Sequence, residues 1–451
     1  MRLSRFALLF LLTAVSLASA QTYSTVLNFN GSNGANPFYV SLVQGRDGRL
    51  YGTTYSGGAN GLGAVIRINL TTKNSVVVHS FSGTDGSNPG AGLTLATDGN
   101  YYGTTVMGGS ANAGVLYKIS TAGTYTVLHQ FAGGSDGANP YGPPIQASDG
   151  NFYGATAGSG ATNATIYKYT SSGAYSVIYT FGESTTGYWV YGLTQGTDGL
   201  LYATSNSGAA ENSGALVKLT TSGVLKGTHT FNPSNDGGNG PSEPIGAPIQ
   251  ASDGNFYGTT QAGGTDREGT LYQVTSVFGV NVPYNFGFNN SSNPSPGLIQ
   301  ASDGNIYGVT SSGDQNIYSW DLTGGGYTSL LTLPAGFFIN GMMQDTSGIF
   351  YGTSWTMGPH NDGYVYSFDM GLGPFIAFVR SQGKVGATAQ ILGQGFTGTT
   401  AVTFNGVTAS FSVVSDTYMT AVVPAGATTG PVVVTTPTGT LTSNPSFRVT
   451  E

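Results

Sequence analysis

A phrase of about five residues recurs seven times along the chain, and its spacing constrains the fold more than any other feature. The copies stand at residues 50–54, 101–105, 152–156, 201–204, 256–260, 306–310 and 350–354. Their central tyrosines, 44 to 55 residues apart, are Tyr51, Tyr102, Tyr153, Tyr202, Tyr257, Tyr307 and Tyr351. A regular period near fifty residues is typical of a repeat architecture, in which each copy builds one structural unit.

Each repeat reads as four short β-strands, here named A to D. In the third copy the β-rich runs are 143–147, 152–156, 164–170 and 174–181, separated by turn residues. Asp149-Gly150, between A and B, favours a tight hairpin because both residues tolerate positive φ. A β-helix has a shorter period, and helical repeats need a 3.6-residue pattern that is absent. The sequence therefore predicts an all-β protein built on a seven-bladed β-propeller.

The ends of the repeat region predict how the ring closes. The seventh copy stops after its strand C, at residues 364–368. A single strand at 23–29 matches strand D of other copies, such as 125–131. We expect this N-terminal strand to complete the last blade and to close the propeller, which removes an open sheet edge.

Two further segments flank the predicted propeller, which spans residues 21–371. Residues 1–20 begin with Arg2 and Arg5, continue with an apolar run and end in Ala18-Ser19-Ala20, which predicts a signal peptide cleaved after Ala20. We therefore expect a secreted protein, located outside the cell, at its surface or in the periplasm. Residues 374–451 lack the repeated phrase and are rich in valine and threonine, which predicts a small immunoglobulin-like β-sandwich.

Composition excludes several kinds of partner. Charged residues make up 8% of the 451 residues, the net charge is −7, and no Lys/Arg cluster follows the leader, so we expect no nucleic-acid partner. No later run is long and apolar enough for a membrane span. The sequence has no cysteine, so packing and strand pairing alone must hold the fold. We expect a monomer.

Two family resemblances follow from these motifs. The phrase Gln-Ala-Ser-Asp-Gly-Asn-Phe-Tyr-Gly-Thr-Thr, complete at 250–260, resembles the GloVer tandem repeat of exported bacterial proteins, over most of residues 22–371. The family implies a secreted or surface protein and carries no catalytic residues. Residues 393–396, 402–406 and 423–427 look like an IPT/TIG-type domain. Asp-Gly-Asn before an aromatic residue is also similar, more weakly, to blades of virginiamycin B lyase-like propellers.

No residue pattern predicts a catalytic, metal or cofactor site. His79, His129 and His229 occupy the same place in strand D of different repeats, so they cannot converge on a metal. A recurring glutamine in strand A (Gln44, for example) is replaced once, by Leu95, and we interpret it as a hydrogen-bonding group between blades. The stretches 33–37, 85–89 and 136–140 admit a calcium loop, but an Asx-turn before proline explains them better.

The predicted working face carries the B–C and D–A connections, which vary in length and sequence between repeats. The candidate ligand-binding residues there are Tyr188, Trp189, Trp355, Met357 and His360, together with the charged residues Glu211, Asp266, Arg267 and Glu268. Exposed tryptophan and tyrosine suit sugar rings or protein partners, although Trp189 and Trp355 could equally fill gaps between blades.

These observations leave two hypotheses for function. The first is an exported, non-catalytic binding or adhesion protein whose ligand is an extracellular glycan or protein. The alternative is an extracellular polysaccharide-active enzyme, a lyase or hydrolase, on the same scaffold. A cluster of acid and base groups converging on one pocket would favour the enzyme.

Overall fold

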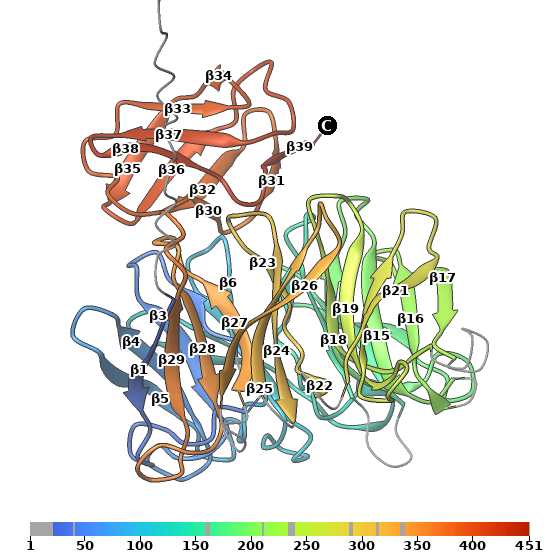
Figure 1. Cartoon of the computed structure of the whole chain (residues 1–451). Helices are drawn as coiled ribbons and strands as arrows, with labels where there is room; N and C mark the ends of the chain where they lie inside the picture. The colour runs from blue at the N-terminus through green and yellow to red at the C-terminus, as the bar shows by residue number, and fades with distance from the viewer. Residues whose placement is uncertain are drawn as a thin grey trace, which may run out of the picture.

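The described part of the chain is built from short β-strands joined by turns and loops. The computed structural model describes residues 21–38, 41–157, 163–209, 212–232, 240–287, 292–312, 315–333 and 339–450, so the predicted signal peptide lies outside the described residues. Within these ranges the regular structure is β, apart from short 3-10 turns such as η1 (Gly134–Asp136). Figure 1 shows the repeat region as a body of upright sheets, with a smaller module above one side of it.

The described residues of the repeat region form seven antiparallel sheets, numbered here in chain order. Sheet 1 contains β2 (Val43–Gln44), β3 (Leu50–Thr54), β4 (Ala64–Asn69) and β5 (Asn74–Ser80). Sheet 2 contains β6 (Thr94–Leu95), β7 (Tyr101–Thr105), β8 (Val115–Ile119) and β9 (Tyr125–Gln130). Sheet 3 contains β10 (Ile145–Gln146), β11 (Phe152–Thr156), β12 (Thr165–Tyr169) and β13 (Tyr175–Thr180).

Sheets 4 and 5 have longer first strands, and in sheet 6 the corresponding stretch is divided into two short strands. Sheet 4 contains β14 (Tyr188–Gln195), β15 (Leu201–Ser207), β16 (Ala215–Leu219) and β17 (Leu225–Thr230). Sheet 5 contains β18 (Pro241–Gln250), β19 (Phe256–Gly263), β20 (Thr270–Val274) and β21 (Val280–Asn285). Sheet 6 contains β22 (Ser292–Pro294), β23 (Ile299–Gln300), β24 (Ile306–Ser312), β25 (Gln315–Asp321) and β26 (Gly326–Leu333).

Sheet 7 is assembled from both ends of the repeat region. It contains β27 (Ile339–Gln344), β28 (Phe350–Ser354), β29 (Tyr364–Asp369) and, as its fourth strand, β1 (Thr22–Asn28). β1 runs antiparallel to β29, with Thr22 opposite Asp369 and Asn28 opposite Tyr364. The N-terminal strand therefore supplies the outer strand that the seventh repeat lacks.

The glycine of the repeated phrase is explained by the residue that lies opposite it on the neighbouring strand. In five sheets this glycine lies opposite a buried tyrosine of the third strand, as Gly154 lies opposite Tyr167, and a β-carbon there would collide with the tyrosine hydroxyl. In sheet 1 the glycine, Gly52, lies opposite Ile66. In sheet 4 the opposing residue is Val217, and Ala203 takes the place of the glycine. The same cross-strand pairing recurs in sheets 2, 5, 6 and 7 as Gly103–Tyr117, Gly258–Tyr272, Gly308–Tyr318 and Gly352–Tyr366.

The tyrosine of the phrase is tied to the turn before it. Tyr102 donates a hydrogen bond from its hydroxyl to Asp98 Oδ2 at 2.9 Å. The connection is longer than the predicted two-residue hairpin: it occupies residues 96–100, and only Gly99 of the Asp-Gly pair has positive φ, at 84°. The aspartate serves as a hydrogen-bond acceptor for the tyrosine hydroxyl. It does not adopt the left-handed backbone conformation that the Asp-Gly pair led us to expect.

Neighbouring sheets are joined by the recurring glutamine. In six sheets its side-chain oxygen accepts a hydrogen bond from a backbone N–H of the preceding sheet, as Gln195 Oε1 does from Ser148 at 2.8 Å. The other five acceptors are Gln44, Gln146, Gln250, Gln300 and Gln344. The Gln44 bond reaches Thr346, so it joins sheet 1 to sheet 7. The predicted hydrogen bond between units is present, and we call it the glutamine latch.

The C-terminal module, residues 375–450, has its own core. One sheet contains β30 (Ala377–Phe378), β32 (Thr388–Leu392), β36 (Tyr418–Val422) and β35 (Phe411–Ser415). A second contains β34 (Val407–Thr408), β33 (Ala401–Phe404), β37 (Val432–Thr436) and β38 (Gly439–Thr442), and a parallel pair joins β31 (Gln382–Lys384) to β39 (Arg448–Thr450). Phe396, Phe404, Met419 and Phe447 are among the side chains of its core.

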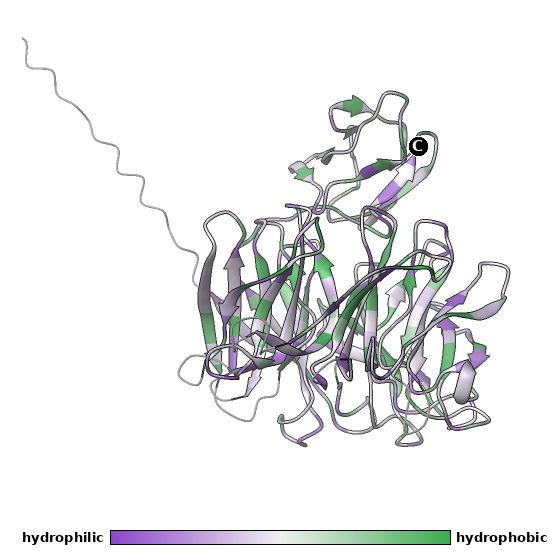
Figure 2. Ribbon diagram, turned by 90° about the vertical axis from the view of Figure 1, so that its right-hand side faces the viewer, coloured by the Kyte–Doolittle hydropathy of each residue, from purple (hydrophilic) through white to green (hydrophobic). Residues whose placement is uncertain are grey.

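The module rests on the face of the sheets that carries the turns between first and second strands, called here the turn face. The hydrogen bonds that cross the contact reach Arg46, Thr97, Gln300 and Thr346, from sheets 1, 2, 6 and 7. Figure 2, a quarter turn away, also places the module at this end of the sheets, away from the opposite face. That opposite face, which carries the loops between second and third strands and between sheets, is called the loop face.

Candidate functional site

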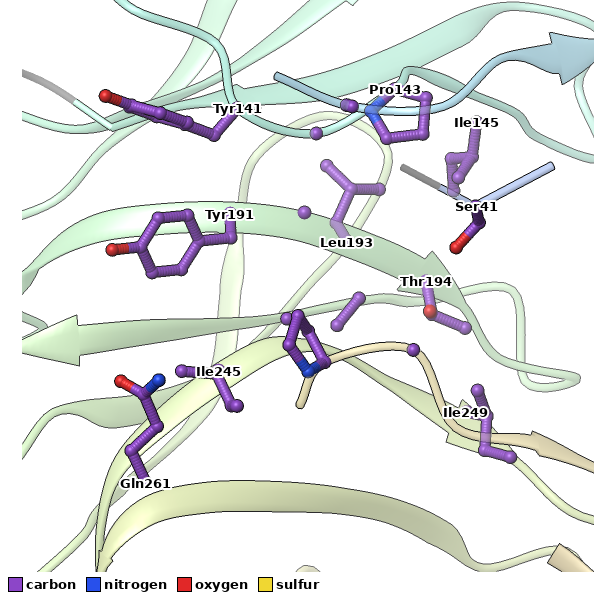
Figure 3. A pocket seen from close by; sticks show the side chains of 17 residues that line it. Ser41, Tyr141, Pro143, Ile145, Tyr191, Leu193, Thr194, Ile245, Ile249 and Gln261 are labelled. Atoms are coloured by element: carbon purple, nitrogen blue, oxygen red, sulfur yellow. The ribbon is translucent and has the colours of Figure 1, made fainter. Parts of the chain in front are cut away.

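A central cavity of about 260 Å³ opens where the first strands of the sheets converge (Figure 3). Its walls come mainly from residues 141–145, from β14 and from β18, with Ser41, Ala91 and Pro296 from other sheets. Glycines allow this convergence: a β-carbon on Gly142 would collide with the carbonyl oxygen of Tyr191. The cavity therefore exists because the repeat keeps small residues where neighbouring backbones approach most closely.

The lining of the cavity is uncharged. It contains no Asp, Glu, Lys, Arg or His among the described residues. Tyr141, Tyr191 and Gln261 gather at one end of the cavity, and Ser41, Thr194 and Ile249 lie toward the other (Figure 3). Such a lining of apolar walls with a few polar groups is typical of small-molecule sites.

Two tyrosines form an aromatic corner at the end of the cavity near the loop face. The rings of Tyr141 and Tyr191 are 5.8 Å apart and nearly perpendicular, at 76°. Burial raises the pKa of Tyr141, and the nearby Tyr55 phenol raises it further. The Tyr141 hydroxyl therefore stays protonated at neutral pH, as a neutral hydrogen-bonding group.

An aromatic rim adjoins this corner on the loop face. Phe38 lies edge-on to Tyr55 at 5.9 Å and to Trp355 at 5.3 Å. Asn36 donates a hydrogen bond from its side chain to the Trp355 carbonyl oxygen at 2.9 Å, which joins sheet 1 to sheet 7 here. We call Phe38, Tyr55 and Trp355 the aromatic rim.

Trp189 holds a backbone conformation that tryptophan rarely adopts. Its φ is 59°, at a repeat position where Asn36, Asn88, Asn139 and Asn293 have φ between 48° and 55°. Asparagine tolerates this left-handed region, whereas a bulky residue is strained there. The side chain is 46% exposed and packs edge-on against Tyr188, with ring centroids 5.8 Å apart. Glu243 stands at the same position of the fifth repeat and has φ of 57°, so the repeat backbone sets this conformation and Trp189 adopts it.

Met357 departs from the repeat in the same way. It has φ of 70° at the position of Gly57, Gly108 and Gly263, and its side chain is 37% exposed. His360 is exposed in the same loop. Trp355 is half-buried against Phe38. Tyr188 is half-buried and donates a hydrogen bond to Asn212 at 3.4 Å.

The structure gathers only part of the predicted set. Trp355 joins the aromatic rim, whereas Tyr188 and Trp189 belong to sheet 4, and none of the five predicted residues lines the cavity. Glu211 lies outside the described residues. Tyr141, Tyr191 and Gln261 were not predicted. The sequence does contain a pattern that could have indicated the two tyrosines. An aromatic residue follows the position that is proline in most repeats, as at Phe38, Tyr141 and Tyr191.

Two of the four histidines, His79 and His129, pack between neighbouring sheets. His79 Nε2 lies 3.0 Å from Asp85 Oδ2, and its ring stacks on Tyr125 of the next sheet at 3.9 Å. His129 repeats this arrangement with Asp136 and Tyr175. Among the residues that the structure describes, no group of three or more His, Cys, Asp or Glu side chains could hold a metal ion. No helix there is long and apolar enough to cross a membrane.

Sequence comparison assigns the family. The Gloeobacter/Verrucomicrobia repeat matches residues 11–202 and 189–414, which is most of the chain. The chain belongs to the Gloeobacter/Verrucomicrobia repeat family. No curated protein sequence matches this member of the family.

Solved structures resemble this family member in fold. A streptogramin B lyase has a TM-score of 0.54 and 14% identity, with 77% of this chain and 97% of that chain covered. Virginiamycin B lyase from Staphylococcus aureus gives the same score and identity, covering 77% and 98%. Oligogalacturonate lyase from Vibrio parahaemolyticus has a TM-score of 0.50 and 12% identity, covering 78% and 97%. At such identities the likeness concerns the propeller-like fold alone.

Proposed function

We propose that this chain is an exported, non-catalytic binding protein that presents the loop face of a seven-bladed β-propeller to an extracellular ligand. The blades are sheets 1 to 7, and β1 closes the ring by completing sheet 7. Contacts between sheets 1 and 7 support closure: Gln44 accepts a hydrogen bond from Thr346, and Asn340 donates one to the Pro37 carbonyl at 2.7 Å. The C-terminal module is an IPT/TIG-type immunoglobulin-like sandwich, residues 1–20 are a cleaved signal peptide, and the protein is a monomer.

The observation that carries this proposal is the uncharged central cavity with its aromatic rim. Polysaccharide lyases and hydrolases need a general acid or base within hydrogen-bond reach of the substrate. Of the groups that act in this way, the described cavity wall carries only tyrosine hydroxyls, with no carboxylate, imidazole or amine beside them; its other polar groups are hydroxyls and one side-chain amide. Hydroxyl and aromatic groups recognise a glycan or protein surface, and in this arrangement they supply binding rather than bond cleavage.

The alternative is a polysaccharide-active enzyme. It is favoured by the fold likeness to three proteins described as lyases, which at 12–14% identity is a likeness of fold alone. It would need catalytic groups elsewhere on the loop face, where Asp266, Arg267 and Glu268 form an acidic and basic loop in sheet 5.

A paired assay separates the two functions. The purified, processed protein is applied to a glycan array, and each glycan that binds is then incubated with the protein and examined for cleavage products. We expect binding with no products. Products that accumulate with turnover would establish the enzyme instead, and binding to no glycan but to an extracellular protein would leave the binding role and change the ligand class.

Substitutions on the loop face test its role. Trp355→Ala and Trp189→Ala should each weaken ligand binding by about 1–3 kcal/mol if the residues are anchors, with little change in melting temperature. Val277→Ala, at an exposed residue of sheet 5 on the turn side, is the control. A large drop in melting temperature with unchanged binding would make both tryptophans packing residues.

A further inference from the structure

We propose that the central cavity binds one uncharged sugar ring, the terminal residue of a glycan, between Tyr141, Tyr191 and Gln261. The inference rests on the proposed function and names the ligand class and its place on the loop face. It is carried by the size of the cavity, by its lack of charge and by the polar groups that its walls leave available.

Size and charge limit the ligand first. A volume of about 260 Å³ lies below the usual range of roughly 300–1,000 Å³ for drug-sized ligands, so one ring fits and a chain does not. A charged ligand would lose hydration without meeting a charged partner, because no described lining residue carries one. An uncharged ligand loses far less on entering. Phosphorylated sugars and uronic acids are therefore disfavoured.

The available polar groups select a hydroxylated ligand over a purely apolar one. At the proposed ring site, the side chains of Tyr141 and Gln261 make no hydrogen bond within the described part of the protein. Those of Thr194 and Ser41, toward the other end of the cavity, make none either. Each hydroxyl can both donate and accept, and the amide offers two donors and an acceptor. A hydrocarbon would leave these groups unpaired, at a cost for each, whereas the hydroxyls of a sugar can pair with them.

The aromatic corner suits the remaining faces of a sugar ring. Tyr141 and Tyr191 meet at 76°, so two ring surfaces of different direction border the same space. The negative face of an aromatic ring attracts the slightly positive C–H groups of a sugar, and Leu193 and Ile245 supply apolar contact beside them. The tyrosine corner lies at the end that continues into the aromatic rim, where the following sugars of a glycan would emerge.

This geometry predicts recognition of chain ends. Because only one ring fits, a glycan enters by its terminus, and the middle of a long chain is excluded. A free monosaccharide of the same kind should therefore compete with the whole glycan for the cavity.

The test uses the full processed chain and a panel of neutral monosaccharides (hexoses and pentoses) with the matching uronic acids, measured by saturation-transfer NMR and calorimetry. At least one neutral sugar should bind and its uronic acid should bind at least about tenfold more weakly. Gln261→Leu and Tyr191→Ala should each weaken binding about tenfold or more, since they remove a hydrogen-bonding group and a ring surface. Tyr141→Phe, which removes only a hydroxyl, should have a smaller effect.

Tyr179→Phe is the matched control, because Tyr179 lies on β13, the outer strand of sheet 3, and does not line the cavity. Melting temperatures of all variants separate folding from binding. Equal binding of neutral and acidic sugars, or glycan binding that Gln261→Leu and Tyr191→Ala leave intact, overturns the cavity assignment while the proposed binding function stands. A protein that binds no glycan and no sugar overturns both the cavity assignment and the glycan ligand.

Discussion

Six junctions between neighbouring sheets are held by the glutamine latch, and the junction between sheets 1 and 2 is held in another way. Leu95 stands in sheet 2 where the other sheets have glutamine, so it cannot accept the hydrogen bond. There Arg46 of sheet 1 donates to the Thr97 carbonyl of sheet 2 at 2.8 Å. Arg46 occupies a turn position that elsewhere carries serine or threonine, for example Ser148 and Thr197.

The C-terminal module acts at that same junction. Gln390 of the module accepts a hydrogen bond from Arg46 at 2.6 Å and donates one to the Thr97 carbonyl at 2.8 Å. The Arg46 guanidinium lies 4.8 Å from the ring centroid of Tyr418, and Leu392 packs in one cluster with Leu95. The one junction between sheets that lacks the glutamine latch is therefore the junction at which the C-terminal module supplies replacement contacts.

The largest effect is expected from Arg46→Ala. It removes the charge-assisted hydrogen bonds to Thr97 and Gln390 and the contact with Tyr418, and should lower the free energy of unfolding by about 3 kcal/mol. Urea denaturation measures it. The control is Arg49→Ala in the same turn, whose exposed pair with Asp47 at 3.3 Å should contribute less than about 1 kcal/mol. Equal effects of the two substitutions would contradict the special role of Arg46.

Removing a glutamine latch at another junction should lower the free energy of unfolding by less than Arg46→Ala does. Gln44→Ala leaves the buried Thr346 N–H without its acceptor, and should lower the free energy of unfolding by about 2 kcal/mol. Gln250→Ala is the comparison, because that side chain is more exposed and water can replace it, so we expect about 0.5–1 kcal/mol. Denaturant titrations of both variants, read at two wavelengths, would show whether burial sets the strength of the latch.

Introducing the glutamine of the other repeats at position 95 should reveal energetic coupling between Arg46 and the latch at the junction of sheets 1 and 2. Leu95→Gln costs apolar contact with the module, but it can restore a latch to the backbone N–H of residue 46. Its destabilising effect should therefore be about 1 kcal/mol smaller in the Arg46→Ala background than in the natural protein. A double-mutant cycle in urea measures this difference. Strict additivity would mean that Arg46 and the latch do not substitute for each other.

The smallest effect concerns pH at the outer edge of that junction, where His79 stacks on Tyr125. Burial lowers the pKa of His79 below 6.5, although Asp85 opposes the shift. The unfolded chain then binds more protons than the folded one, so stability is complete above pH 6.5 and declines as pH falls below it. Urea midpoints at pH 7.5 and 5 should differ less for His79→Gln than for the natural protein. An unchanged difference would place the acid sensitivity elsewhere.

The repeating part of this architecture could be predicted from sequence, since one repeat explains the others. The all-β class, the four strands of a repeat and the latch between units were all predicted. Even the exceptions were visible, because Leu95 breaks the glutamine series and Ala203 breaks the glycine series. The contacts that replace the missing latch could not be predicted. They come from Arg46 and Gln390, which are 344 residues apart in sequence.

The site shows the same limit. Trp189 and Met357 could be identified because each departs from what the repeat places at that position. Tyr141, Tyr191 and Gln261 meet only through packing between three sheets, each contributed by a different repeat, and a single sequence gives no distance between them. The strain at Trp189 was also hidden, since the asparagines of other repeats indicate a left-handed backbone only once their φ values are known.

The pairing of β1 with β29 determines how the molecule would respond to mechanical tension. Thr22 and Asp369 lie side by side, and the chain continues from Asp369 toward the C-terminal module. A tether at the N-terminal end of β1 and a load on the module would therefore pull the two strands apart at the same end. Their hydrogen bonds would then open one pair after another, as in a zipper, rather than share the force. If the protein were attached by only one of its two ends, no tension would act across the pairing of β1 with β29.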